Sequence, residues 1–107
     1  MRTLTYQVKS QRLLPTGNHS GLIAGSQGYL KAMFVFDDEW NGCVKVASFF
    51  NNGSEHAVLL DKNNECMIPT EALTNSIFEV CVEGRKDNYR ILSSKIKERQ
   101  RVVRSGD

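Results

Sequence analysis

Residues 29–42 carry the strongest fold signals in the sequence, because they combine a clear strand with a reversal of the chain. They read Tyr-Leu-Lys-Ala-Met-Phe-Val-Phe-Asp-Asp-Glu-Trp-Asn-Gly. Over 29–36, apolar side chains fall on both faces of an extended chain, which indicates a central strand of a sandwich or a strand whose second face is covered. The Asn41-Gly42 pair favours a tight turn, since both residues tolerate the backbone angles of a reversal. The stretch therefore predicts β structure.

The same alternation and turn chemistry extend over the rest of the chain. Leu4, Tyr6 and Val8 alternate with polar residues, as in a half-buried strand. Residues 15–18 predict a turn, and further strands are expected over 22–24, 44–50, 56–60, 65–68, 77–82 and 89–97. Strands that recur roughly every 8 to 14 residues are typical of sandwiches and barrels. We therefore predict an all-β fold, an antiparallel β-sandwich of about seven or eight short strands, with one short helix near residues 69–74.

Length and composition limit the class of protein. The 107 residues are 40% hydrophobic and 24% charged, which is a globular balance, too short for two cores and too polar for a membrane protein. We expect a single sandwich domain over 1–97, followed by a basic tail or linker over 98–107. The formal net charge of +2 divides unevenly, because residues 1–94 sum to −1 and residues 95–107 to +3. The body of the domain gives no electrostatic reason to expect nucleic acid, and we predict no membrane partner.

The cysteines and histidines indicate no catalytic or metal-binding chemistry. Cys43, Cys66 and Cys81 form no CxxC pair and are expected to be free thiols of a protein made and folded in a cytosol. His19 and His56 are expected at the surface. With no nucleophile or phosphate-binding motif, we predict that the chain is not an enzyme and holds no metal or cofactor. A reactive thiol at Cys43 or Cys81 is the weaker alternative.

The reversal at 37–42 is the most distinctive local cluster. Asp38 and Glu39 precede Trp40, the single tryptophan of the sequence. Carboxylates in such a turn could hold a calcium ion, and an exposed indole ring could stack on a sugar. The alternative, which the sequence favours, is that Trp40 covers one end of the core while the acids remain in solvent.

A second cluster lies near the C-terminus, where basic residues recur at every second position. An extended chain would place them on one face, and the set is Lys95, Lys97, Arg99 and Arg101. The simpler interpretation is that these cations keep an edge strand from pairing with other chains, and an acidic protein surface is the functional candidate. Nucleic-acid binding would call for aromatic stacking residues, and none occurs between Leu92 and Asp107.

Short motifs in a fixed order connect these features. From Phe34 to Ile91 the chain carries Phe-Val-Phe-Asp-Asp-Glu-Trp-Asn-Gly, Lys-Val-Ala-Ser-Phe at 45–49, Val-Leu-Leu-Asp at 58–61, Cys-Met-Ile-Pro at 66–69, Glu-Ala-Leu at 71–73 and Tyr-Arg-Ile at 89–91. This order resembles the N-terminal domain of minor structural proteins from phages of Gram-positive bacteria, the phage baseplate upper protein family. The resemblance covers the middle of the chain.

The resemblance implies a non-enzymatic structural module of a phage tail or baseplate, synthesised in the host bacterial cytoplasm and located in the virion. Its partners would be other tail or baseplate proteins, and a homo-oligomer is expected. On this interpretation Asp38, Glu39 and Trp40 belong to the family signature, with no ligand implied. The alternative function is a carbohydrate-binding sandwich that recognises bacterial cell-wall glycans through Trp40, together with Tyr29 or Tyr89.

Overall fold

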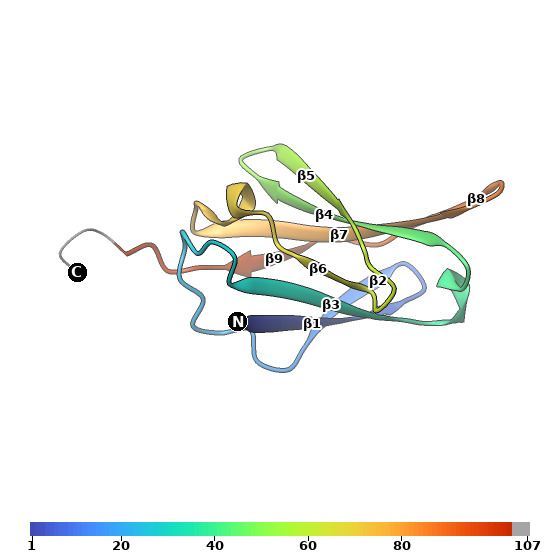
Figure 1. Ribbon diagram of the computed structural model, residues 1–107, viewed down its shortest axis with the longest axis horizontal. Coiled ribbons are helices and arrows are strands. Elements are labelled where there is room, and N and C mark those ends of the chain that lie inside the picture. Colours follow the sequence, from blue (N-terminus) through green and yellow to red (C-terminus); the bar gives the residue numbers. More distant parts are fainter. Residues whose placement is uncertain (104–107) are drawn as a thin grey trace.

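Two β-sheets packed against each other form the protein (Figure 1). The structure is a computed structural model, and it describes residues 1–103. Its elements in this range are β1 (Arg2–Lys9), β2 (Arg12–Thr16), β3 (Leu30–Phe36), η1 (Asp38–Trp40), β4 (Val44–Asn51), β5 (Ser54–Leu59), β6 (Glu65–Met67), η2 (Thr70–Leu73), β7 (Ile77–Lys86), β8 (Tyr89–Leu92) and β9 (Ile96–Arg99). The predicted all-β sandwich is confirmed.

The first sheet has the strand order β2-β1-β3-β6. β1 runs parallel to β3, whereas the other two pairs are antiparallel. The predicted antiparallel pairing is therefore wrong for the β1–β3 pair alone. Parallel strands need a long connection, and here β2 and residues 17–29 supply it. This connection returns the chain to the start of β1, where the Arg2 N–H donates to the Tyr29 carbonyl at 2.9 Å.

The second sheet has the order β5-β4-β7, and both β8 and β9 pair with the far side of β7. The single strand expected over 89–97 is thus two strands. Ser93 joins them, because its N–H donates to the Val82 carbonyl and its Oγ accepts from the Val82 N–H, each at 2.9 Å. The hydrogen bonding along β7 therefore continues across the gap between β8 and β9.

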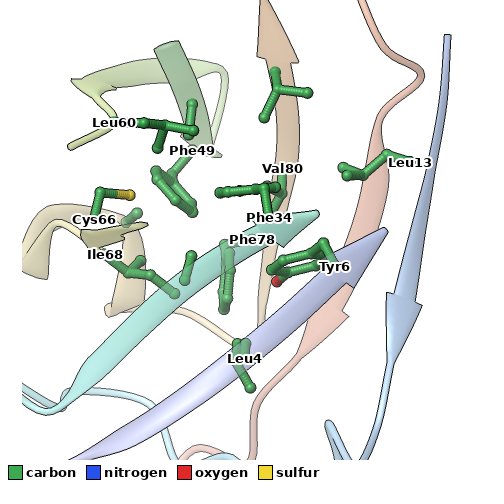
Figure 2. Close-up of a cluster of buried hydrophobic side chains, with 14 of the residues drawn as sticks. Leu4, Tyr6, Leu13, Phe34, Phe49, Leu60, Cys66, Ile68, Phe78 and Val80 are labelled. Carbon is green, nitrogen blue, oxygen red and sulfur yellow. The ribbon is translucent and has the colours of Figure 1, made fainter. Parts of the chain in front are cut away.

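Alternate side chains of both sheets meet in one apolar core (Figure 2). Each strand turns every second side chain inward, which explains the period-2 pattern of the sequence. The fully buried inward residues include Leu4, Tyr6, Val8, Phe34, Phe49, Phe78, Val80 and Val82. The Tyr6 ring stacks on the Phe34 ring at a centroid distance of 5.1 Å. The second face of β3 is not covered, since Val35 is exposed.

Both helices are single 3-10 turns that connect strands. η2 follows Pro69 and buries Ala72 and Leu73, which confirms the short helix predicted near residues 69–74. η1 forms within the corner where only a polar turn was expected. No helix in the described part of the chain is both long and apolar enough to cross a membrane.

Two local predictions near the N-terminus are wrong. β2 includes Pro15, where a turn was expected, and proline is tolerated there because β2 is an edge strand that need not donate every backbone hydrogen bond. Residues 22–24 do not form a strand. Ile23 instead makes one isolated parallel bridge with Arg101.

The sandwich extends beyond the predicted boundary at residue 97. β9 continues to Arg99, and both Glu98 and Gln100 are buried. The Arg101 N–H donates to the Leu22 carbonyl at 2.8 Å. The predicted tail over 98–107 is therefore wrong for residues 98–101, which belong to the sandwich, and residues 104–107 lie outside the described residues.

Two buried acids make the fold sensitive to alkaline pH. Burial, with a smaller contribution from the Asp61 carboxylate, raises the pKa of the Cys66 thiol to about 12. Burial, and then the Glu98 carboxylate, raises the pKa of the Tyr6 phenol well above its ordinary value. In the unfolded chain both groups lose their protons at lower pH, so the stabilisation is fully present below about pH 8.5 and declines as the pH rises.

We expect the free energy of unfolding, measured by urea titration, to fall between about pH 9 and pH 11. Each of the two groups contributes a slope of about 1.4 kcal/mol per pH unit once its unfolded form is ionised. The Cys66→Ala variant should be less stable throughout but should show a shallower decline, because one of the two acids is gone. A slope that this substitution leaves unchanged would contradict the assignment.

Candidate functional site

The candidate functional site is the outward side of β9, which carries the basic residues identified in the sequence. Lys97, Arg99 and Arg101 are exposed, whereas the alternate residues Glu98 and Gln100 are buried. The prediction that an extended chain places the cations on one face is confirmed for these three. None of them forms an ion pair with another residue in 1–103. Their charges therefore face solvent without a carboxylate partner in this range.

Lys95 precedes β9 and has a different environment. Its Nζ lies 3.8 Å from the centroid of the Phe50 ring, a distance at which the ring attracts the cation. Burial raises the pKa of the Cys81 thiol, and the charge of Lys95 offsets part of that shift. Register aligns Phe50 with Lys97 through Glu79. The fourth predicted cation therefore lies on the same face as the other three, where it covers apolar surface of the sheet.

Buried polar contacts hold the inward side of β9. Gln100 Nε2 donates to the carbonyls of Leu73 and Asn75 at 3.2 and 2.9 Å. The Gln100 N–H donates to the Ser76 carbonyl at 2.7 Å. Because these bonds fix the backbone of the strand, the cations on its outward side keep the regular spacing of alternate strand residues, roughly 6.8 Å.

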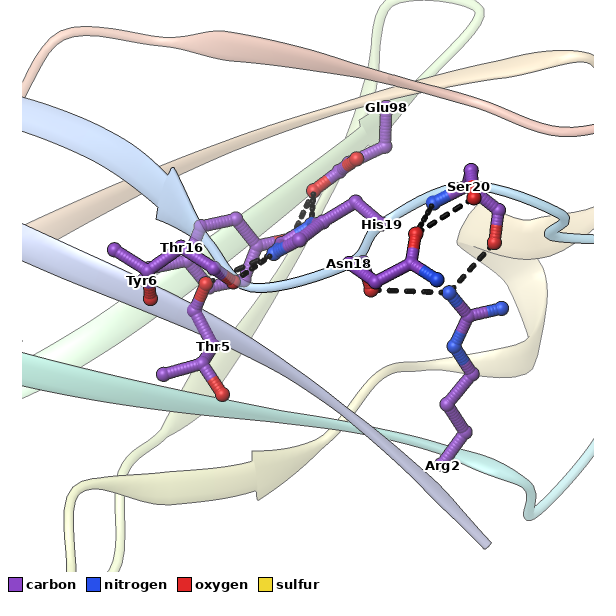
Figure 3. A network of polar contacts seen from close by, with 8 residues as sticks. All are labelled: Arg2, Thr5, Tyr6, Thr16, Asn18, His19, Ser20 and Glu98. Carbon is purple, nitrogen blue, oxygen red and sulfur yellow. Dashed lines mark hydrogen bonds and ion pairs between the residues drawn. The ribbon is translucent and has the colours of Figure 1, made fainter.

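Glu98 is the centre of a polar network beneath β9 (Figure 3). The Tyr6 hydroxyl donates to Glu98 Oε2 at 2.6 Å, and His19 Nδ1 lies 2.7 Å from the same oxygen. His19 Nε2 lies 2.9 Å from each of the carbonyl oxygens of Thr5 and Thr16. The network therefore connects β1, β2, the segment after β2 and β9.

His19 joins a buried carboxyl group to two backbone carbonyls. Nε2 faces only carbonyl oxygens and therefore donates, while Nδ1 faces the Glu98 carboxyl group. Glu98 is only 5% exposed, and a carboxyl group at such a position requires close polar partners. The expectation that His19 is a surface residue is wrong, and no local pattern could have found it, because Glu98 lies 79 residues away.

The corner at 37–42 is a structural junction. Asp37 caps η1 by accepting from the Glu39 N–H at 3.1 Å, and its other oxygen accepts from the Ser10 N–H at 2.6 Å. Trp40 Nε1 donates to the Ser10 carbonyl at 2.8 Å, and its ring packs on Phe36 with 5.0 Å between centroids. These contacts fasten the β1–β2 turn to the connection between β3 and β4.

Trp40 has no exposed surface, so its ring cannot stack on a sugar. The predicted glycan contact through Trp40 is therefore wrong, and the interpretation that Trp40 covers one end of the core is confirmed. Asp38 and Glu39 are exposed, as expected. Tyr29 and Tyr89 are partly exposed, but the start of β3 and the β7–β8 hairpin lie at opposite ends of the sandwich (Figure 1). They form no shared platform.

Other parts of the described chain offer little chemistry. In residues 1–103 no group of three or more His, Cys, Asp or Glu side chains is arranged to hold a metal ion. Two surface hollows of about 360 and 280 Å³ include neither the basic residues near the C-terminus nor Asp38, Glu39 and Trp40, although Cys43 lines the first hollow and Tyr29 the second. The three cysteines are free, and Cys43 is buried. The raised pKa of Cys81 is the opposite of what a reactive thiolate requires.

In comparisons with known proteins, no family model, no curated protein and no solved structure matches the chain. The likeness to baseplate upper proteins stays a prediction from the sequence motifs.

The buried contact between His19 and Glu98 leads to a first test of the site. We expect His19→Ala to lower the free energy of unfolding, measured by urea titration, by about 1–3 kcal/mol, because Glu98 loses a hydrogen-bonded partner while remaining buried. Adding Glu98→Gln should recover part of this loss, since a neutral amide is less costly to bury than a carboxylate. His56→Ala is the control, because His56 makes no side-chain hydrogen bond within the described residues. A loss below about 0.5 kcal/mol for His19→Ala would contradict this contact.

A second test concerns the close contact between Trp40 and Gly84. A Cβ atom on Gly84 would lie 2.8 Å from Trp40 Cε3 and 3.1 Å from Cys43 Cβ. We expect Trp40→Ala to cost about 3–5 kcal/mol of unfolding free energy and Gly84→Ala about 1–3 kcal/mol. In the Trp40→Ala background Gly84→Ala should cost less, because the ring no longer occupies the space. Equal costs in both backgrounds, by urea unfolding, would argue against this contact.

Proposed function

We propose that this protein is a non-enzymatic docking module of a phage tail or baseplate. In this proposal Lys97, Arg99 and Arg101, together called the β9 row, bind an acidic surface on another tail or baseplate protein. The observation that carries the proposal is the row itself, which presents three exposed cations. The buried contacts of Glu98 and Gln100 hold the inward side of the same strand. The module would act in the virion after its synthesis in the host cytoplasm.

The surroundings of β9 favour recognition over simple protection of a sheet edge. The Ser94 N–H donates to the Gln11 carbonyl before the strand, and the Arg101 N–H donates to the Leu22 carbonyl after it. These bonds already occupy the free edge near both ends of β9. The cations are therefore not the main barrier to pairing with another chain. Cations on a fixed strand instead suit a complementary acidic surface, since no backbone order has to be created on binding.

The assignment to a tail or baseplate is supported by the order of the motifs between Phe34 and Ile91. Within the fold these motifs lie on strands of both sheets and on both 3-10 helices. Because the motifs are spread over the whole sandwich, we interpret them as a signature of the fold and not of a ligand site. The Asp-Glu-Trp motif forms η1, whose buried ring and capping contacts are typical of a structural signature.

Binding to candidate partners tests the proposal. The purified chain is measured by surface plasmon resonance against tail and baseplate proteins encoded by neighbouring genes, at low and high salt. We expect the wild type to bind at least one of them with a Kd that rises with salt, because screening weakens exposed charge pairs. The double variant Arg99→Glu/Arg101→Glu should raise that Kd at least about tenfold, since it opposes like charges.

Lys9→Glu is the control for charge reversal, because it reverses one positive charge on an exposed residue of the other sheet. This variant should bind as the wild type does. Absence of binding to every candidate, or an equal loss in Lys9→Glu and in the double variant, would count against the proposal.

A further inference from the structure

The outward side of the five-stranded sheet, called the outer face, consists of four columns of side chains. The columns follow the strand order β5, β4, β7 and then β8 together with β9. Residues paired directly across strands point to the same side of a sheet, so register aligns the columns into rows. Two of these rows have ends that complement each other.

The first row has opposite charges at its ends. Register pairs Glu55 on β5 with Phe50, and Phe50 with Glu79. Glu79 in turn pairs with Lys97 on β9. Glu55 and Lys97 are exposed at the two margins of the sheet, three strand spacings or about 14 Å apart. Neither forms an ion pair within residues 1–103, so the row runs from a negative margin to a positive one.

The second row has apolar residues at both ends. Register pairs Leu59 on β5 with Val46, and Val46 with Glu83. Glu83 in turn pairs with Leu92 on β8. Leu59 is 64% exposed and Leu92 is 40% exposed. Ion pairs with Arg85 and Arg90 compensate the negative charge of Glu83, which lies between the two leucines. Hydrogen bonds from these two arginines lower the pKa of Glu83.

A single symmetry operation matches both rows. A twofold axis that runs parallel to the strands, between β4 and β7, exchanges the two margins of the face. It lays β8 and β9 of a second copy over β5 of the first. Lys97 of the second copy then faces Glu55, and Leu92 of the second copy faces Leu59. Each contact occurs twice, as in any isologous interface.

We propose that the outer face binds a second copy of this chain face to face, as a symmetric dimer. The inference deepens the docking function proposed above and rests on it, because it names one partner of the same surface. Register aligns Arg99 with Ile77, level with the β4–β5 turn, and Arg101 lies beyond it. Both arginines therefore remain at the rim of the dimer, which offers two cationic ends to acidic partners.

The dimensions of the outer face predict a weak dimer. Four strands about 4.8 Å apart, over a length of about 27 Å as in the eight-residue β4, cover roughly 500 Å² in projection. A standard interface buries roughly 800 Å² on each partner. We therefore expect a dissociation constant in the micromolar range or weaker, which the charge contacts can shift measurably.

Sedimentation equilibrium over about 10 μM to 1 mM tests the dimer. The wild type is expected to approach twice the chain mass of 12.1 kDa as its concentration rises. Glu55→Lys and Lys97→Glu should each raise the dimer Kd at least about tenfold, because each creates two like-charge contacts in the symmetric interface. The double variant Glu55→Lys/Lys97→Glu should return the Kd to near the wild-type value, since the pair is only exchanged.

Lys9→Glu is again the control and should dimerise as the wild type does, and circular dichroism verifies that each variant is folded. A wild-type mass of 12.1 kDa at every concentration, or a double variant weaker than both single variants, overturns the dimer. The two proposals fail separately. A monomeric wild type that still binds a tail protein through the β9 row overturns the dimer alone. Glu55→Lys, which leaves the β9 row intact, should lose the dimer while keeping tail-protein binding.

Discussion

A carboxylate buried between two sheets needs hydrogen-bond donors from its surroundings, and much of this structure follows from how Glu98 obtains them. Tyr6 of the four-stranded sheet and His19 of the connecting segment meet the same oxygen of Glu98. His19 also holds carbonyl groups of β1 and β2 through its second nitrogen. Without these partners, the desolvated carboxyl group would oppose the packing of the sheets. With them, one oxygen atom fixes the position of β9 against β1 and closes one side of the core.

The same interaction determines which side of β9 faces solvent. Side chains alternate along a strand, so an inward Glu98 directs Lys97 and Arg99 outward. A slip of β9 by one residue would bury a lysine or an arginine, which is costly, and would take the Glu98 acceptor away from Tyr6 and His19. An apolar residue at position 98 would pack more simply but would specify the register less strictly. The polar anchor thus protects the arrangement of charges on which the proposed docking surface depends.

The sequence predicts best those features that depend on neighbours in the chain. The alternation at Leu4, Tyr6 and Val8 and the turn residues between strands led to the correct fold class, and the alternation over 95–101 located the cationic face. The parallel pairing of β1 with β3 and the partners of His19 depend on segments far apart in the chain and leave no local pattern. The burial of Trp40 could be predicted only in part. The sequence of the corner is compatible with an inward or an outward ring, and packing against Phe36 and Gly84 determines the orientation of Trp40.

The separation of Tyr6 and Glu98 along the chain also affects how the protein reaches its folded state. They are 92 residues apart and belong to different sheets. Contacts between such distant residues form slowly, because a long loop has to close first. During translation the four-stranded sheet can pair once β6 has left the ribosome, but the core stays open along one side until β9 follows. A nascent chain that pauses before residue 98 therefore exposes apolar side chains of β1 and leaves His19 without the Glu98 carboxyl group, a state in which chains are prone to aggregate.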